Sequence, residues 1–187
     1  YKDAVLSGNF MAIRQVSWQV DDLKNSSKAQ RLLELCDVAK EQGRKVIVFS
    51  FFRSTIQKVI ELLGDRCTEP ITGEISPQRR QEIVDAFAQA DAGAVLVSQV
   101  QAGGTGLNIQ AASVVVFCEP QLTPAIENQA IARAYRMGQT RDVLVYRLLA
   151  DETIDERMLE ILSTKQKEFD AFAEDSVIGD LQMQTDT

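Results

Sequence analysis

The stretch "KVIVFSF" at residues 45–51 decides the fold of this 187-residue chain. Its β-branched and aromatic side chains are nearly continuous, which is typical of a strand buried on both faces of a sheet. Three later stretches have the same character, namely "AVLVSQ" (94–99), "SVVVFCE" (113–119) and "VLVYRLL" (143–149). Helical patterns separate these strands, so the sequence predicts an α/β fold with a mainly parallel sheet and helices on both sides.

Capping residues mark where the helices begin. Apolar residues recur at helical spacing between Ser27 and Gly43, which predicts a helix there. Ser26 and Ser27 can cap the start of this helix, and Gly43 marks its end. A short strand is predicted near Cys67 to Ile71. Further helices are predicted from about Ser54 to Leu63, after Ser76 and Pro77, and after Thr123 and Pro124.

Composition excludes several classes of protein. No apolar run is long enough to span a bilayer, and the N-terminal "YKDAVLSGNF" lacks the pattern of a signal peptide, so the expected compartment is the cytoplasm. Histidine is absent, which excludes Ser/His and Cys/His catalysis and imidazole metal sites, and no metal site is predicted. The three cysteines, Cys36, Cys67 and Cys118, are expected to be buried free thiols.

The formal net charge of -7 weighs at first against a polyanionic partner. Most of the acidity lies at the C-terminal end, where residues 150–187 carry 11 acidic and 3 basic side chains. Residues 1–149 therefore hold 16 acidic and 17 basic side chains, which is close to neutrality and compatible with a local basic face.

Ligands of open parallel sheets gather at the carboxyl ends of the strands. The segment "SQVQAGGTGLN" (98–108) follows a strand, and its glycines suit close approach by a phosphate, although an ordinary loop explains them equally well. Ser50 ends the first strand and can offer a hydroxyl to a phosphate or act as a turn residue. Arg79 and Arg80 follow a predicted helix start and face either a phosphate or solvent.

The segment "QAIARAYRMGQ" (129–139) has a polar stripe. Gln129, Arg133 and Arg136 stand at i, i+4 and i+7, which places them on one face of a continuous helix. A solvated amphipathic helix and a cationic binding face both fit this pattern. In the second case the arginines would stabilise negative charge on a transferring phosphoryl group.

Three motifs in this order resemble a known family: "AGGTGLN" (102–108), "RMGQTRDVLVYRL" (136–148) and "TIDERML" (153–159). Together they are similar to the second RecA-like lobe of superfamily-two helicases, and more narrowly to the Swi/Snf-type DNA translocases of bacterial type. The likeness covers about Lys28 to Leu162. It implies a RecA-like three-layer α/β/α fold with a C-terminal helical extension.

The resemblance also implies a division of the chain and a set of roles. Residues 1–27 would be left from the region between two lobes, 28–149 would form the second lobe, and 150–187 an acidic brace helix and tail. Arg133 and Arg136 would be arginine fingers that reach the γ-phosphate of ATP, and the remaining expected contacts are Gly106, Asn108 and Gln129 to the nucleotide, and Ser50, Gly73, Arg80, Ser98 and Gly103 to a DNA backbone.

Some positions support or depart from the family pattern. Arg80 is preferred to Arg79 because the family's G-S-T-x-x-x-x-R spacing, counted from Gly73, ends on it. Ala132 and Tyr135 replace a common glycine and histidine, and both suit a helix. The loop "EPQLTP" (119–124) replaces the usual "DPWWNP", so the role of that loop is not carried over.

Phosphoryl transfer needs a phosphate cradle and a metal, and this chain has no Walker A sequence and no "DEGH"-type motif. We therefore expect ATP and Mg²⁺ to be bound mainly by an N-terminal RecA-like lobe of the same protein. The present chain alone is not expected to hydrolyse ATP. Its expected partners are that N-terminal lobe and the backbone of duplex DNA. No membrane contact is expected, and the expected location is the bacterial nucleoid. Coupling between DNA and nucleotide is expected to run from the Ser98 loop to the Arg133 helix.

Three alternatives stay open. The nearest is the second lobe of a strand-separating DNA or RNA helicase, against which the "RMGQTRDVLVYRL" continuation favours the Swi/Snf type, and another is a nucleotide-free protein-docking module. The third concerns the acidic helix that begins at a capping box of Thr153 and Glu156. This helix either braces the lobe or shields its DNA face, and its expected buried stripe is Ile154, Met158, Ile161 and Leu162.

Overall fold

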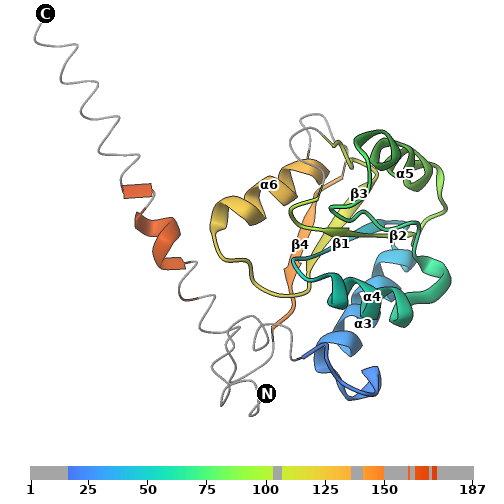
Figure 1. Ribbon diagram of the computed structural model, residues 1–187, viewed down its shortest axis with the longest axis horizontal. Coiled ribbons are helices and arrows are strands. Elements are labelled where there is room, and N and C mark those ends of the chain that lie inside the picture. The colour runs from blue at the N-terminus through green and yellow to red at the C-terminus, as the bar shows by residue number, and fades with distance from the viewer. Residues whose placement is uncertain are drawn as a thin grey trace, which may run out of the picture.

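The computed structural model describes residues 17–102, 107–135, 141–149, 160, 163–168 and 170–171. Within them four strands form one sheet in the order β2-β1-β3-β4, and every neighbouring pair is parallel (Figure 1). In the central register Val48 lies opposite Val97 on one side and Val116 on the other. The α/β prediction is confirmed, with strands β1 (Lys45–Ser50), β2 (Val95–Gln99), β3 (Ala112–Phe117) and β4 (Leu144–Arg147).

The sheet lies between two hydrophobic cores because successive side chains of a strand point to opposite faces. On β1, Val46 and Val48 join one core, whereas Ile47 and Phe49 join the other. Helices α3 (Ser27–Glu41) and α4 (Arg53–Leu63) cover the first face, and α5 (Pro77–Gln89) and α6 (Pro124–Ala134) cover the second (Figure 1). This arrangement is the predicted three-layer α/β/α fold. Two short 3-10 helices, η1 (Leu23–Asn25) and η2 (Gly64–Arg66), complete the described elements.

The predicted helix starts are confirmed by their capping contacts. Ser26 Oγ accepts a hydrogen bond from Ala29 N at 3.2 Å, and Ser76 and Thr123 cap α5 and α6 in the same way. Gly43 follows α3 with a φ of +67°, a conformation that glycine adopts at little cost. Thus local chemistry sets the helix boundaries, and only α4 begins one residue before the predicted Ser54.

The predicted strand from Cys67 to Ile71 is wrong as a continuous element. The segment touches β2 only through two isolated parallel bridges, Cys67 to Val95 and Ile71 to Ser98. Pro70 lies between the bridges and has no N–H to donate, which interrupts the ladder. The segment nevertheless runs along the edge of β2 and leads towards the carboxyl end of the sheet.

Packing begins before the predicted lobe boundary at residue 28. Trp18 is fully buried in the core beneath α3, and its indole Nε1 donates to the Cys118 carbonyl at 3.2 Å. Lys28 Nζ donates to the same oxygen at 3.0 Å. Ser26 Oγ donates to the Ser17 carbonyl at 2.7 Å. The described residues of the first segment therefore pack as part of the lobe.

The cysteines are unpaired, as predicted, although their burial differs. Cys36 and Cys118 are buried and Cys67 is half-buried. Burial raises the pKa of the Cys36 thiol to about 12 and that of Cys67 to about 11. These thiols are therefore neutral at pH 7 and behave as small apolar groups.

Part of the acidic C-terminal helix is described. Residues 163–168 are helical and mostly exposed, and Lys165 Nζ donates to the Leu122 carbonyl at 3.4 Å. The capping box at Thr153 and the expected apolar stripe lie outside the described residues. No described helix is long and apolar enough to cross a membrane.

Candidate functional site at the carboxyl edge of the sheet

The described site residues gather where the parallel strands end. Ser50 and Gln99 are the last residues of β1 and β2 and lie opposite each other in register. Gly73 follows the bridge between Ile71 and Ser98, so it reaches the same edge. The parallel sheet thus brings together residues far apart in the sequence, as expected for ligand sites of this fold class.

Arg133 is fixed in the last turn of α6. Ala130 and Ala134 on this helix are buried in the core, which anchors the backbone beside Arg133. The Arg133 guanidinium donates through Nη1 to the Ala102 carbonyl at 3.1 Å and lies 5.9 Å from the centre of the Phe49 ring. These contacts hold a long, flexible cation in one direction at the sheet edge.

The backbone of Arg133 is held as well. Ile109 N donates to the Arg133 carbonyl at 2.7 Å, and Ala102 binds the side chain of the same residue. Ala102 and Ile109 flank the glycine-rich segment of residues 103–106. Both ends of that segment are therefore tied to one arginine.

The electrostatics at Arg133 favour an anion. Burial lowers the pKa of Arg133, and the positive charge of Arg80 lowers it further. Arginine stays charged in proteins nonetheless, so the two guanidiniums repel each other across this edge. A bound phosphate would relieve both the desolvation and the repulsion.

Arg80 has unused hydrogen-bonding capacity. Its Nη2 donates to the Gly73 carbonyl at 3.2 Å, whereas its Nε is buried and has no hydrogen-bond partner among the described residues. A buried donor without a partner carries a free-energy cost that a ligand or water removes. The Arg80 side chain is half-buried beside the exposed Gly73, so its positive charge, and not the buried Nε, is what this edge offers to an anion.

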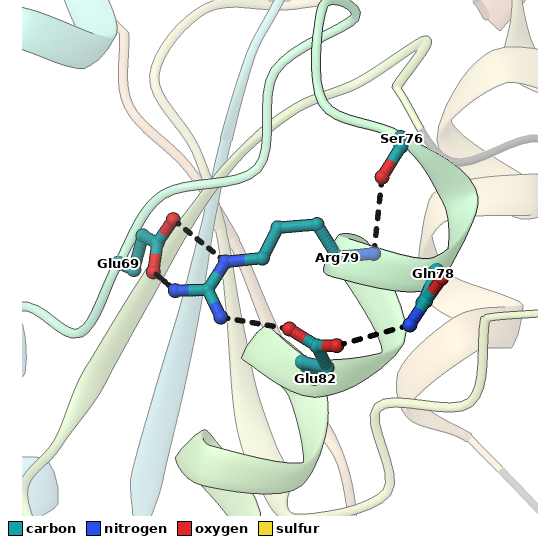
Figure 2. A network of polar contacts seen from close by, with 5 residues as sticks. All are labelled: Glu69, Ser76, Gln78, Arg79 and Glu82. Carbon is teal, nitrogen blue, oxygen red and sulfur yellow. Dashed lines mark hydrogen bonds and ion pairs between the residues drawn. The ribbon is translucent and has the colours of Figure 1, made fainter.

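Arg79 has a different environment, although it precedes Arg80 on α5. Figure 2 shows its guanidinium between Glu69 and Glu82: Nε donates to Glu69 at 3.3 Å, Nη1 to Glu82 at 2.8 Å, and Nη2 pairs with Glu69. The hydrogen bonds to Glu82 and Glu69 raise the pKa of Arg79. Its charge is already matched, which agrees with the choice of Arg80 made from motif spacing.

Ser50 and Ser98 have almost no exposed surface. Ser50 Oγ donates to the Glu119 carboxylate, with its two oxygens at 3.0 and 3.1 Å, and Ser98 Oγ donates to the Gln99 carbonyl at 3.2 Å. Their burial leaves neither hydroxyl surface to offer to a phosphate. Both side chains instead support the backbone at the strand ends, and the predicted phosphate contact is not carried forward for them.

The loop that departs from the family pattern contains a buried carboxylate. Glu119 Oε1 accepts from Phe51 N at 2.7 Å and from Gln121 Nε2 at 3.3 Å, and Gln121 also donates to the Glu119 carbonyl at 2.8 Å. Both side chains are fully buried. Burial raises the pKa of Glu119, and the hydrogen bond from Phe51 opposes this shift most strongly. Sequence reasoning missed this network, for which the unusual loop was the available signal.

A second buried carboxylate fixes the start of α6. Glu127 accepts from Gln121 N at 3.2 Å through one oxygen and from Arg147 Nε at 2.6 Å through the other. The Glu127 side chain is only 2% exposed. This contact joins β4 to α6, and so sets where the helix points Arg133.

The remaining predicted residues divide into two groups. Gln129 and Asn108 are exposed. α6 ends at Ala134 and Tyr135 has an extended backbone, so the described part of the predicted helical stripe is Gln129 and Arg133. Gly103, Gly106 and Arg136 lie outside the described residues.

The donor set at this edge suits a phosphate better than a metal. Phosphate oxygens accept hydrogen bonds from cationic and polar groups, and this edge carries Arg80, Arg133 and the exposed Gly73 backbone. The described residues contain no group of three or more His, Cys, Asp or Glu side chains arranged to hold a metal ion.

Two surface hollows lie at the opposite, amino edge of the sheet. One of about 470 Å³ is lined by residues that include Arg66 and Cys67, and one of about 270 Å³ by residues that include Arg44 and Arg141. None of the predicted site residues lines either hollow. The described residues of the candidate site therefore lie away from these two hollows.

Comparisons with known proteins agree with this geometry. The model of the helicase conserved C-terminal domain matches residues 27–138. An uncharacterized ATP-dependent helicase of Mycoplasma pneumoniae is 37% identical over 147 residues, which cover 78% of this chain and 14% of that protein. The DNA repair protein RAD5B of Arabidopsis thaliana is 35% identical over 157 residues, which cover 80% of this chain and 12% of that protein.

A chromatin protein and a solved structure are also similar. The SWI/SNF-related matrix-associated actin-dependent regulator of chromatin subfamily A member 1 of Mus musculus is 33% identical over 143 residues, or 73% of this chain and 13% of that protein. The crystal structure of the C-terminal part of the Fun30 ATPase domain has a TM-score of 0.68 at 24% identity, over 86% of this chain and 52% of that one, which shows a shared fold.

The chain spans only 12 to 14% of the length of these three relatives. The matched segment covers strands β1 to β3 and the helices around them, including the α6 helix that carries Arg133. The chain belongs to the helicase conserved C-terminal domain family, and it is a C-terminal RecA-like lobe of the SNF2 type.

Proposed function

We propose that this chain is the second motor lobe of an ATP-dependent translocase that moves along double-stranded DNA. The observation that carries the proposal is the environment of Arg133, which is tied to both flanks of the glycine-rich segment and forms no ion pair with a described carboxylate. Such a preorganised cation is suited to stabilise negative charge on a transferring phosphoryl group.

In this proposal the two lobes divide the chemistry. The N-terminal lobe holds ATP and Mg²⁺, which supplies the phosphate cradle and the metal that phosphoryl transfer requires. This lobe contributes Arg133 and Arg136 as arginine fingers, with Gly106, Asn108 and Gln129 near the nucleotide. Closure of the lobes would bring the arginines to the γ-phosphate, and hydrolysis would let the lobes reopen.

DNA would be held by its backbone at the same edge. Gly73 is exposed, and the half-buried Arg80 donates to its carbonyl and has no ion pair among the described residues. Gly103 would add a backbone contact. These groups bind phosphates without reading bases, which suits movement along duplex DNA of any sequence.

The decisive experiment replaces Arg133 or Arg136 by alanine in the full-length protein. DNA-stimulated ATP turnover should fall by about 10³-fold or more, because an arginine finger acts on the transition state. Binding of ATP, measured with a fluorescent analogue, should change little. Arg79→Ala is the matched control, since that arginine is paired with two carboxylates away from the proposed contacts.

Three other outcomes would count against the proposal. Unchanged turnover in both variants would end the arginine-finger assignment. A strand-displacement assay on a forked substrate tests the second-lobe alternative, because efficient unwinding would assign the chain to a strand-separating helicase. If this lobe binds a separately expressed N-terminal lobe yet the pair shows no ATP turnover with duplex DNA, a docking function replaces the motor.

A further inference from the structure

Gln99 connects three segments at the sheet edge. Its side-chain Oε1 accepts from Gly73 N at 3.0 Å, and its Nε2 donates to the Phe51 carbonyl at 3.3 Å. Its backbone N donates to the Ile71 carbonyl at 2.8 Å. One residue thus joins the end of β1, the segment that carries Gly73 and the end of β2.

The same residue also leads to Arg133. Ala102 N donates to the Gln99 carbonyl at 3.0 Å, and the Ala102 carbonyl accepts from Arg133 Nη1 at 3.1 Å. A continuous path of hydrogen bonds therefore runs from the Gly73 amide through Gln99 and Ala102 to the Arg133 guanidinium. On its other side, the Gly73 carbonyl accepts from Arg80 at 3.2 Å.

An amide side chain is suited to this position because it donates and accepts at once. A carboxylate would keep the acceptor for Gly73 N but would place a second acceptor against the Phe51 carbonyl. An aliphatic side chain of similar size would satisfy neither group. The side chain of Gln99 is half-buried, so these contacts are partly shielded from competing water.

We infer that Gln99 is a positioning residue that couples occupancy of the Gly73 segment to the placement of Arg133. The inference rests on the proposed function, in which a DNA phosphate binds at Gly73 and Arg80. A phosphate that shifts the Gly73 peptide also shifts the Gln99 side-chain amide, whose oxygen accepts from Gly73 N. The shift then reaches Arg133 through the turn from Gln99 to Ala102. Gln99 itself touches neither the reacting phosphate nor the nucleotide.

The test uses the full-length protein with Gln99→Leu and the matched control Gln101→Leu. Gln101 lies two positions further along the same turn, and it is exposed. The measured quantity is the ratio of ATP turnover with saturating duplex DNA to turnover without DNA. We expect Gln99→Leu to lower this ratio by about fivefold or more, the size of a typical coupling effect, and Gln101→Leu to leave it unchanged.

Two further readouts separate coupling from damage to the fold. Hydrogen exchange of the Gly73 amide should become faster in Gln99→Leu, because that amide loses its acceptor. If Gln99→Leu lowers the melting temperature strongly, Gln99→Glu separates the two causes, since the carboxylate keeps an acceptor for Gly73 and loses only the donor to the Phe51 carbonyl. The ratio and the exchange of the Gly73 amide should then stay close to those of the natural protein, and a ratio lowered as far as in Gln99→Leu would overturn the inference.

The outcomes distinguish this inference from the proposed function. If Arg133→Ala abolishes turnover while a folded Gln99→Leu variant keeps the full DNA stimulation, the coupling role of Gln99 is wrong and the motor assignment stands. If Arg133→Ala keeps its DNA-stimulated turnover, the proposed function itself fails. A lowered ratio in both Gln99 and Gln101 variants also overturns the inference, because it points to a general effect of the turn.

Discussion

Arg79 on the outer face of α5 is held in a different way from the two arginines at the sheet edge, Arg80 and Arg133. On the outer face, Arg79 is paired with two carboxylates, Glu69 and Glu82 (Figure 2). At the edge, Arg80 and Arg133 donate to backbone carbonyls, and neither forms an ion pair within the part of the chain that the structure describes. A carboxylate cancels the charge of an arginine, whereas a carbonyl fixes its direction and leaves the charge in place.

The pKa shifts express the same difference. Hydrogen bonds to Glu82 and Glu69 raise the pKa of Arg79, whereas burial and the nearby charge of Arg80 lower the pKa of Arg133. The outer arginine is stabilised as a cation by the protein itself. The edge arginines lack that stabilisation, so an added anion gains more free energy there. Charge matching therefore separates structural cations from those that are available to a ligand.

The largest effect on stability is expected for an ion pair whose carboxylate is buried. Glu127 pairs with Arg147 and also accepts from Gln121 N, and its side chain is 2% exposed. Glu127→Ala leaves both donors without an acceptor, so the free energy of unfolding should fall by about 2–4 kcal/mol. Urea denaturation monitored by circular dichroism measures this.

The matched control is Glu82→Ala, which removes an exposed partner of Arg79. Water replaces the lost contact at an exposed site, so this variant should lose far less stability. Similar losses for Glu82→Ala and Glu127→Ala would show that burial does not set the energy of these pairs, and the distinction drawn between the two regions would fail.

The next effect concerns DNA affinity and compares neighbouring arginines. Arg80→Ala in the full-length protein should weaken binding of duplex DNA by about tenfold and reduce the slope of log K against log salt by about 0.9, as for one lost phosphate contact. Arg79→Ala should change neither quantity, because its charge is matched by carboxylates. Fluorescence anisotropy over a series of salt concentrations measures both, and equal losses would contradict the assignment.

Most of the fold could be predicted because its signals are local. The continuous apolar run of β1 predicts a strand buried on both faces, and Ser26, Ser76 and Thr123 cap helices as their positions suggest. The error at Cys67 to Ile71 has a local cause as well, since Pro70 breaks the ladder. Local chemistry thus specifies both the success and the failure.

The site could be predicted only in part because its contacts are not local. Motif spacing selected Arg80 and Arg133, which the structure brings to one edge. The supports of these residues pair groups that are distant in the sequence, such as Gln99 with Gly73, Ser50 with Glu119, and Trp18 with Cys118. No periodicity or capping pattern carries that information, so these partners appear only when the sheet is assembled.

A pH dependence should further separate the interior from the surface. The pKa of Glu119 is raised by burial, so the folded protein holds this proton more tightly than the unfolded chain does. The stability of the natural protein relative to Glu119→Gln should therefore rise as the pH falls from 7 towards the ordinary pKa of glutamate. Urea midpoints of both proteins across this range measure the difference. A relative stability that decreases as the pH falls would contradict the raised pKa of Glu119.

The smallest effect is expected for the outer-face network of Figure 2, and it tests whether matched surface charge matters at all. The side chains of Glu69 and Arg79 are 46% and 51% exposed, so water and salt screen their attraction. Glu69→Gln should lower the melting temperature slightly in a buffer of low ionic strength, and the difference should disappear in 1 M NaCl, where the screening length is about 3 Å.

A double-mutant cycle with Arg79→Ala isolates the contribution of this pair, since the Arg79 side chain also contacts Glu82. Its coupling energy should be small and sensitive to salt. A large coupling energy that persists in 1 M NaCl would mean that the outer-face pair behaves like the buried Glu127–Arg147 pair. Carboxylate matching would then no longer mark Arg79 as a surface contact, and its use as the neutral control for Arg80 would have to be abandoned.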